Sequence, residues 1–151
     1  MIIRSLVLAA VGLTALGLTY VRIAPTDPAV WNVDPTKAIR SGKPNDYLVA
    51  DGGNRPAIVS DVPPADLLSR IDAVAMAEVG VTRLAGSPDE GLITYVQRSR
   101  IIGFPDAISV SARPDGMDSR LNIWSRSRYG QYDFGVNRAR VERWLAALNL
   151  G

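Results

Sequence analysis

An unbroken apolar run opens the chain. No charged residue occurs between Ser5 and Val21, and Arg4 and Arg22 flank the run. As an α-helix this run is about 26 Å long, at the short end of what spans a hydrocarbon core. Because no polar face interrupts it, the run predicts a membrane segment and not a buried helix of a soluble protein. Residues 1–23 are therefore interpreted as a membrane anchor or a signal segment.

An uncleaved anchor is favoured over a signal peptide. Ala15 and Gly17 form a poor cleavage site, and Pro25 blocks a cut after Ala24. The short charged region around Arg4 favours a cytoplasmic N-terminus and an exported C-terminal domain. Export after signal cleavage is the alternative.

Periodic patterns return only at Pro64. Residues 24–63 hold most of the ten prolines, without lasting helical or alternating spacing, and predict an extended strap. From Pro64 to Gly80, apolar residues at helical spacing predict an amphipathic helix. Four β-strands are expected over residues 81–85, 92–100, 106–112 and 119–127, with turn-forming residues between them. Apolar residues then mark a closing helix that docks on the sheet: Val141, Trp144, Leu145 and Leu148.

This order, α-β-β-β-β-α, predicts an α+β domain over residues 64–151. Four strands joined by short turns form an antiparallel meander, and the two flanking helices pack on one of its faces. With the N-terminal transmembrane helix, the expected organisation is anchor, strap and domain.

Composition removes most familiar catalytic chemistry. The chain has no cysteine and no histidine, so thiolate nucleophiles, imidazole bases and nearly all zinc sites are excluded. No catalytic residue, cofactor or metal site is predicted. A hydrolase using Ser125 or Ser127 with Asp106 or Asp133 lacks an evident base and is the least favoured possibility.

Charge divides unevenly along the chain. Residues 23–91 carry six basic and ten acidic side chains, whereas residues 92–151 carry nine arginines and five acids. Either the halves neutralise each other within one domain, or the basic half faces an anion. Nucleic acid is not expected outside the cytoplasm.

Strand periodicity gathers several arginines on one sheet face. In the last strand, Asn122, Trp124, Arg126 and Arg128 alternate with Leu121, Ile123, Ser125 and Ser127. The second strand places Arg98 and Arg100 on a single face. The candidate residues for binding an anion or a partner are Arg98, Arg100, Trp124, Arg126, Arg128 and Arg138.

The start of the closing helix predicts a structural clasp. Asn137 is the expected N-cap, which puts Arg138 and Arg140 in the first turn, where the helix dipole disfavours cations. Asp133 is the nearest acid, and we expect it to pair with Arg128 or Arg138. Gly130 and Gly135 allow the loop to fold back and complete this clasp.

These residues resemble a known family, the domain of unknown function 1499 family (DUF1499). The shared C-terminal motif comprises Ser125, Ser127, Arg128, Gly130, Asp133, Gly135, Asn137, Arg138 and Arg140. An earlier block is similar at Tyr95, Arg98, Ser99, Phe104 and Asp106, and the resemblance covers roughly residues 44–148. Trp124 replaces an arginine of the family pattern, and a family cysteine near Asn45 is absent. The resemblance implies a small anchored or exported domain and no particular activity.

Two functions follow as hypotheses. The first is a binding or assembly module, an accessory protein of a membrane complex, held in the bacterial inner membrane with its domain in the periplasm. The second is a site for an anionic small molecule, a phosphate or a lipid headgroup on the arginine-rich face.

Overall fold

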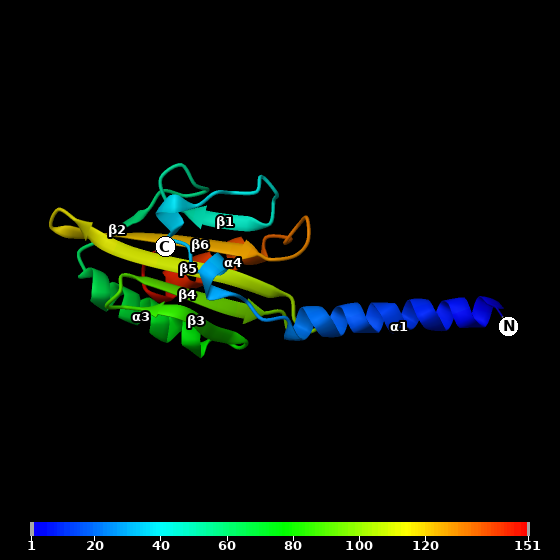
Figure 1. The fold of residues 1–151 in the computed structure, drawn as a ribbon. Coiled ribbons are helices and arrows are strands. Elements are labelled where there is room, and N and C mark those ends of the chain that lie inside the picture. The colour runs from blue at the N-terminus through cyan, green and yellow to red at the C-terminus, as the bar shows by residue number, and fades with distance from the viewer. Residues whose placement is uncertain (1, 151) are drawn as a thin grey trace.

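The computed structural model describes residues 2–150, an α+β domain that carries one long apolar helix. Helix α1 (Ile2–Ile23) projects from one end of the domain (Figure 1). Residues Ile3–Ile23 are long and apolar enough to cross a membrane, and the domain buries none of this helix. The apolar N-terminal helix predicted from the sequence is therefore present.

The predicted antiparallel meander is also present. Its strands are β3 (Val81–Ser87), β4 (Leu92–Arg98), β5 (Pro105–Asp115) and β6 (Asp118–Ser127). Each pairs antiparallel with the next, so consecutive strands are neighbours throughout.

Two further strands make the sheet wider than predicted. β1 (Asp46–Val49) and β2 (Ile58–Ser60) pair with β6 one after the other along its edge, which gives the order β1-β6-β5-β4-β3 with β2 beside β6. The predicted number of four strands is wrong, because both additional strands lie in the proline-rich segment. At four and three residues they are too short to show an alternating pattern.

The two predicted helices cover one face of this sheet. Helix α3 (Pro64–Ala77) buries Leu67, Leu68, Ile71 and Ala75, and helix α4 (Val136–Ala147) buries Val141, Trp144 and Leu145. The buried apolar residues of α4 are among those predicted, and Leu148, just after the helix, packs against the same core. The buried residues of both helices meet sheet residues such as Ile108 and Ile123 in the main core.

Trp144 and Tyr95 occupy the centre of that core. Their rings meet edge to face, with centroids 5.7 Å apart. Both polar atoms have partners, since the Tyr95 hydroxyl donates to Asp72 at 2.9 Å and the Trp144 indole donates to Glu78. The core is thus tied to α3 and to the residue that follows it.

The opposite sheet face is covered by residues 24–38, which we call the crossing segment. It contains two short helices, α2 (Pro28–Trp31) and η1 (Pro35–Lys37), whose first turns are capped by Asp27 and Asp34. A small second core of Leu48, Ala50 and Trp124 packs against its Val33 and Ala38. Figure 1 shows α2 on the face of the sheet opposite α4.

The uneven charge distribution is partly neutralised within the domain. Ion pairs join the acidic and basic parts of the chain at Arg113 and Asp34, Arg120 and Asp51, and Arg143 and Glu78. A fourth pair, Arg55 and Glu142, crosses in the reverse direction. Internal neutralisation, one of the two interpretations of the sequence, therefore accounts for part of the charge asymmetry.

Trp144→Ala tests the core. Because Trp144 is 1% exposed, its truncation should lower the free energy of unfolding by about 3–5 kcal/mol. Urea unfolding followed by circular dichroism measures the loss. Val136→Ala, at a half-exposed position of the same helix, is the control and should change stability little. Equal midpoints for both variants would contradict this packing.

Tyr95→Phe tests the alkaline limit of stability. Burial and the hydrogen bond to Asp72 raise the pKa of the Tyr95 phenol, whereas an unfolded tyrosine titrates near about pH 10. The folded protein therefore holds this proton longer, and stability falls as the pH rises above about 10. Tyr95→Phe should make that decline shallower in urea unfolding between about pH 8 and pH 11. An unchanged decline would contradict the assignment.

Candidate functional site

Arg126 is buried in the middle of the sheet face that the crossing segment covers. Its guanidinium lies over the rings of Trp124 and Trp31, with centroid distances of 4.0 and 5.3 Å. It donates to the Trp31 carbonyl at 2.6 Å and to the Ser109 hydroxyl at 3.2 Å. Burial, partly offset by nearby Asp46, lowers the pKa of Arg126 to about 10. Arg126 therefore fastens the crossing segment to the sheet.

Arg98 and Arg128 hold the start of the same segment. Arg98 donates to the carbonyls of Val21 and Ala24, at 3.2 and 2.8 Å. Arg128 donates to the Pro25 carbonyl at 2.8 Å. The last turn of α1 and the residues after it are thus bonded directly to the ends of two strands.

The alternation of β6 correctly predicts which residues share a face. The sequence does not predict that residues 24–38 cover this face. The arginines bind backbone carbonyls of that segment, and every residue type has such a carbonyl. Each arginine also lies about seventy or more residues away from its carbonyl partner in the sequence. The three arginines that we expected to face an anion or a partner instead bond to backbone within the chain.

The other candidates lie apart from these three. Arg100 is exposed in the turn after β4, and Arg138 is exposed on α4, 6.0 Å from the Tyr47 ring centroid. Trp124, one of the candidate binding residues, is buried at 7% exposed, so its ring offers little surface to a partner. Its indole donates to Asp46 at 2.9 Å. The six predicted residues therefore do not form one site.

The predicted clasp exists with different partners. Helix α4 begins at Val136 with Gly135 in the N-cap position, so the assignment of Asn137 as N-cap is wrong. Asp133 accepts from the amides of Gly135 and Asn137, at 3.0 and 2.9 Å. The left-handed backbone of Gly135 (φ 79°) lets these amides point at one carboxylate, which makes Asp133 the capping residue. No ion pair joins Asp133 to Arg128 or Arg138 among residues 2–150.

Asn137 is fully buried and joins the loop to the sheet. Its side-chain Nδ2 donates to the Asn45 backbone carbonyl and to the Ser127 hydroxyl, at 3.1 and 3.0 Å. Gly130 adds a second link, since its carbonyl accepts from the Asn45 side chain at 2.9 Å. Hydrogen bonds at Gly130 and at Asn137 therefore fix the 128–135 loop near both of its ends.

Arg140 is a core residue, and because α4 begins at Val136 it lies past the first turn in which the sequence placed it. It is 3% exposed and pairs with Asp106 at 2.8 Å. It also donates to the Ser125 hydroxyl at 2.8 Å, and Ser125 in turn donates to Asn137. Asp106, not Asp133, offsets this cation. Because Ser125 is fully buried, it has no access to a substrate and the hydrolase hypothesis loses one of its two nucleophiles.

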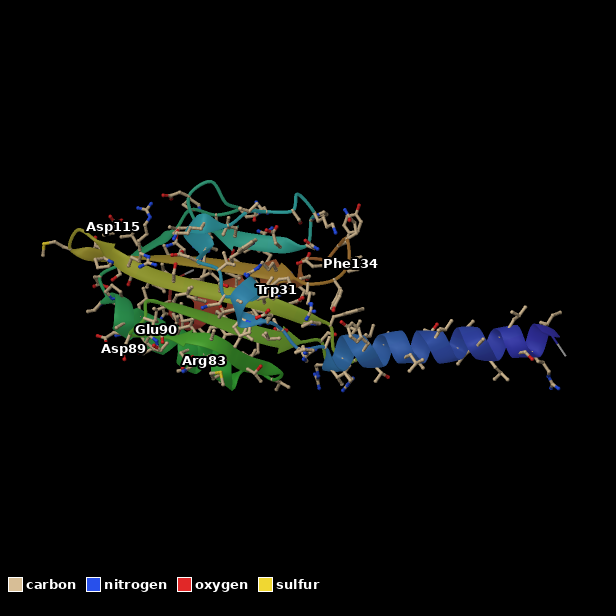
Figure 2. All side chains as sticks on the ribbon, viewed as in Figure 1. Trp31, Arg83, Asp89, Glu90, Asp115 and Phe134 are labelled. Atoms are coloured by element: carbon tan, nitrogen blue, oxygen red, sulfur yellow. The ribbon has the colours of Figure 1, made fainter. Side chains whose placement is uncertain are left out.

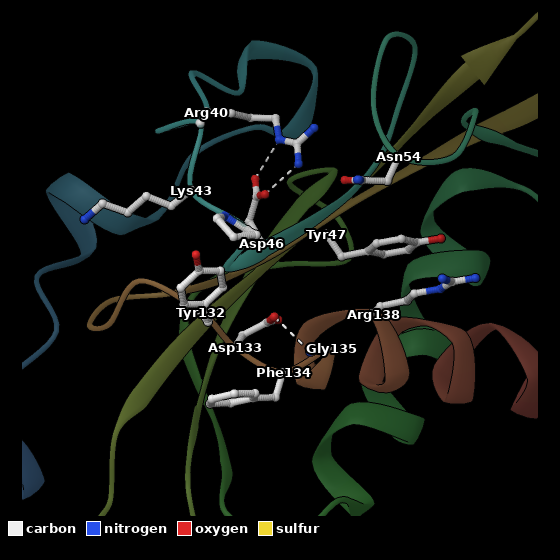
Figure 3. A pocket seen from close by; sticks show the side chains of 12 residues that line it. Arg40, Lys43, Asp46, Tyr47, Asn54, Tyr132, Asp133, Phe134, Gly135 and Arg138 are labelled. Carbon is white, nitrogen blue, oxygen red and sulfur yellow. Dashed lines mark hydrogen bonds and ion pairs between the residues drawn. The ribbon is translucent and has the colours of Figure 1, made fainter.

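An open cleft lies beside the 128–135 loop, and we call it the aromatic cleft (Figure 3). Its volume is about 840 Å³. The side chains around it come from the 40–47 segment, the 132–135 loop and α4: Arg40, Lys43, Asp46, Tyr47, Asn54, Tyr132, Asp133, Phe134 and Arg138. The cleft thus combines aromatic rings with cations.

The charges of the aromatic cleft are only partly paired. Asp46 accepts two hydrogen bonds from Arg40, at 2.6 and 2.8 Å, and Asp133 accepts from the backbone amides of Gly135 and Asn137. In the part of the chain that the structure describes, Lys43 and Arg138 form no ion pair. The cleft therefore presents two available cations beside exposed rings.

Phe134 is the most unusual residue of the aromatic cleft. It is 97% exposed and adopts a left-handed backbone (φ 54°), which disfavours a bulky side chain by about 1–2 kcal/mol. Neighbouring Tyr132 is 63% exposed. Neither ring stabilises the fold through burial. Sequence reasoning missed both residues, and the one available signal is the presence of large rings in a polar, glycine-flanked loop.

A family model described as "Protein of unknown function (DUF1499)" matches residues 26–148. The chain belongs to this family. The match covers most of the crossing segment, the whole sheet and α4. Comparison with curated proteins finds no match.

Asp133→Ala tests the corrected clasp of this DUF1499 protein. Loss of the acceptor for the backbone amides of Gly135 and Asn137, at the start of α4, should lower the free energy of unfolding by about 1–2 kcal/mol. Asp133→Asn keeps an acceptor oxygen without the charge and should lose clearly less. Thermal and urea unfolding of both variants measure the difference. Equal losses would show that the charge, not the capping bond, is what stabilises the loop.

Proposed function

We propose that this protein is a membrane-anchored, extracytoplasmic binding module that engages a protein partner of a membrane complex through the aromatic cleft. The observation that carries the proposal is Phe134, an almost fully exposed ring on a strained backbone. A glycine or asparagine would fit this backbone better, so the stability of the fold does not account for the phenylalanine. Exposed aromatic rings are typical of the centres of protein interfaces.

The chemistry of the aromatic cleft favours an acidic partner segment. Lys43 and Arg138 supply positive charge, and Tyr132 and Phe134 supply apolar surface (Figure 3). A segment with one or two carboxylates next to an apolar residue would satisfy both. The open shape suits a peptide or loop better than an enclosed small molecule.

Contacts at the end of α1 support an anchor that is retained. Arg98 and Arg128 bond to carbonyls from Val21 to Pro25, and Ala24 is 1% exposed. Removal of residues up to Ala24 would take away the two carbonyls, of Val21 and Ala24, that Arg98 uses in the folded domain. A signal segment discarded on export would have no need for such contacts.

Binding of an anion on the arginine-rich sheet face has less support. Arg98, Arg126 and Arg128 already bond to the crossing segment or the residues before it, so an anion would have to displace that segment. Ser125 is also buried, which weakens the hydrolase alternative.

Phe134→Asn separates binding from stability. Asparagine tolerates the left-handed backbone, so the free energy of unfolding should stay the same or rise by about 1 kcal/mol. A photo-crosslinking residue introduced at the exposed position Gln131, next to Tyr132 in the loop, should capture a membrane protein in the parent, and Phe134→Asn should abolish this crosslink. Intact-mass analysis of the membrane fraction reports whether residues before Ala24 are retained.

Met117 provides the matched control for this experiment. It is 99% exposed in the turn between β5 and β6, at the end of the domain away from α1, where Figure 2 labels Asp115. Met117→Asn should leave the crosslink unchanged. A crosslink that survives Phe134→Asn, or that Met117→Asn removes equally, would contradict the role of the aromatic cleft.

A further inference from the structure

A second exposed apolar surface lies in the turn between β4 and β5, residues 99–104, which we call the β4–β5 turn. Ile101 is 88% exposed, Ile102 38% and Phe104 37%. The turn is well defined, because the Ser99 hydroxyl accepts from the amides of Gly103 and Phe104 at 3.0 and 2.9 Å. Its shape therefore presents isoleucine side chains to the surroundings.

The β4–β5 turn packs directly against the end of α1. The Arg22 guanidinium donates to the Ile101 carbonyl at 2.9 Å. Gly103 has a positive φ of 85°, and a Cβ placed there would lie 2.8 Å from Cγ of Arg22. The close approach of helix and turn thus requires glycine at this position.

Arg22 also indicates the depth of this turn relative to a bilayer. The uncharged run of α1 ends at Val21, so Arg22 marks the place where hydrocarbon would give way to headgroups. Since Ile101 bonds to Arg22, the turn lies at the same level along the helix axis.

The side chains around this level have the composition of a membrane interface. Tyr20 is 60% exposed on α1, and Phe104 lies 6.2 Å from Tyr129, ring centroid to centroid. Arg100 is exposed in the same turn. Rings, isoleucines and arginines at one height match a surface that meets acyl chains and phosphates together.

We propose that the β4–β5 turn inserts into the interface of the bilayer that holds α1. Ile101 and Ile102 lie among the first acyl carbons, and Arg22 and Arg100 lie among the lipid phosphates. This inference rests on the proposed membrane anchoring of α1 and does not depend on the aromatic cleft. With the bonds of Arg98 to Val21 and Ala24, the turn gives the domain a second point of attachment and so one orientation on the membrane.

The absence of cysteine in the sequence makes a direct test possible. Single variants Ile101→Cys, Leu13→Cys and Met117→Cys of the full chain are each labelled with an environment-sensitive fluorophore. Each is reconstituted into vesicles of phosphatidylcholine and phosphatidylglycerol that contain spin-labelled lipid. Leu13 reports insertion of α1, and Met117 reports a position at the far end of the domain. Unfolding of each labelled variant in urea verifies that the domain is intact.

Insertion predicts a blue-shifted and quenched signal at Ile101, mainly with the spin label near the headgroup. Leu13 should be quenched mainly by the label deep in the acyl chains, and Met117 by neither. If Leu13 is quenched while Ile101 behaves like Met117, the inference is overturned and the anchor stands. If neither Leu13 nor Ile101 is quenched, anchoring and interfacial insertion both fail.

Discussion

Arginines of the sheet bind the backbone carbonyls of Val21, Ala24, Pro25 and Trp31, and these bonds hold α1 and the crossing segment in place. A segment with little regular structure leaves its carbonyls without the partners that a helix or strand would give. Arg98, Arg126 and Arg128 each donate to one or more of these carbonyls. This arrangement closes the second sheet face, fixes Trp31 over Arg126 and joins α1 to the domain. The β4–β5 turn depends on it, because the bonds of Arg98 hold the end of α1 beside this turn.

The regular part of the fold could be predicted from periodicity. Apolar residues recur at helical spacing in α3 and α4 and lie in short runs between turns in the four-stranded meander. This spacing indicated both the type of each element and its buried residues. Strands β1 and β2 were not predictable. They are short, lie among prolines, and exist because β6 offers an unpaired edge. That edge is a property of the assembled sheet, not of the segment that pairs with it.

The partners of the candidate site residues could not be predicted from periodicity. Alternation places Arg126 on the correct face, but the carbonyl of Trp31 that it binds has no signature in the sequence. Asp133 was recognisable as the acid that stabilises the 128–135 loop. Its partners were not, because the positive φ of Gly135 turns two amides toward the carboxylate and removes the need for an arginine. Phe134 was not predicted, because no pattern in the sequence shows that a ring in this loop is exposed.

The bonds at the end of α1 leave no flexible linker between helix and domain. Polypeptide linkers give a tethered domain a range of heights and tilts, and the range grows with linker length. Here the carbonyls of Val21, Ala24 and Pro25 are already engaged. In a bilayer the domain would therefore stay at a nearly constant distance from the membrane surface as it diffuses. A partner whose binding segment lies at that distance meets a high local concentration of this protein, whereas one that reaches farther from the membrane meets almost none.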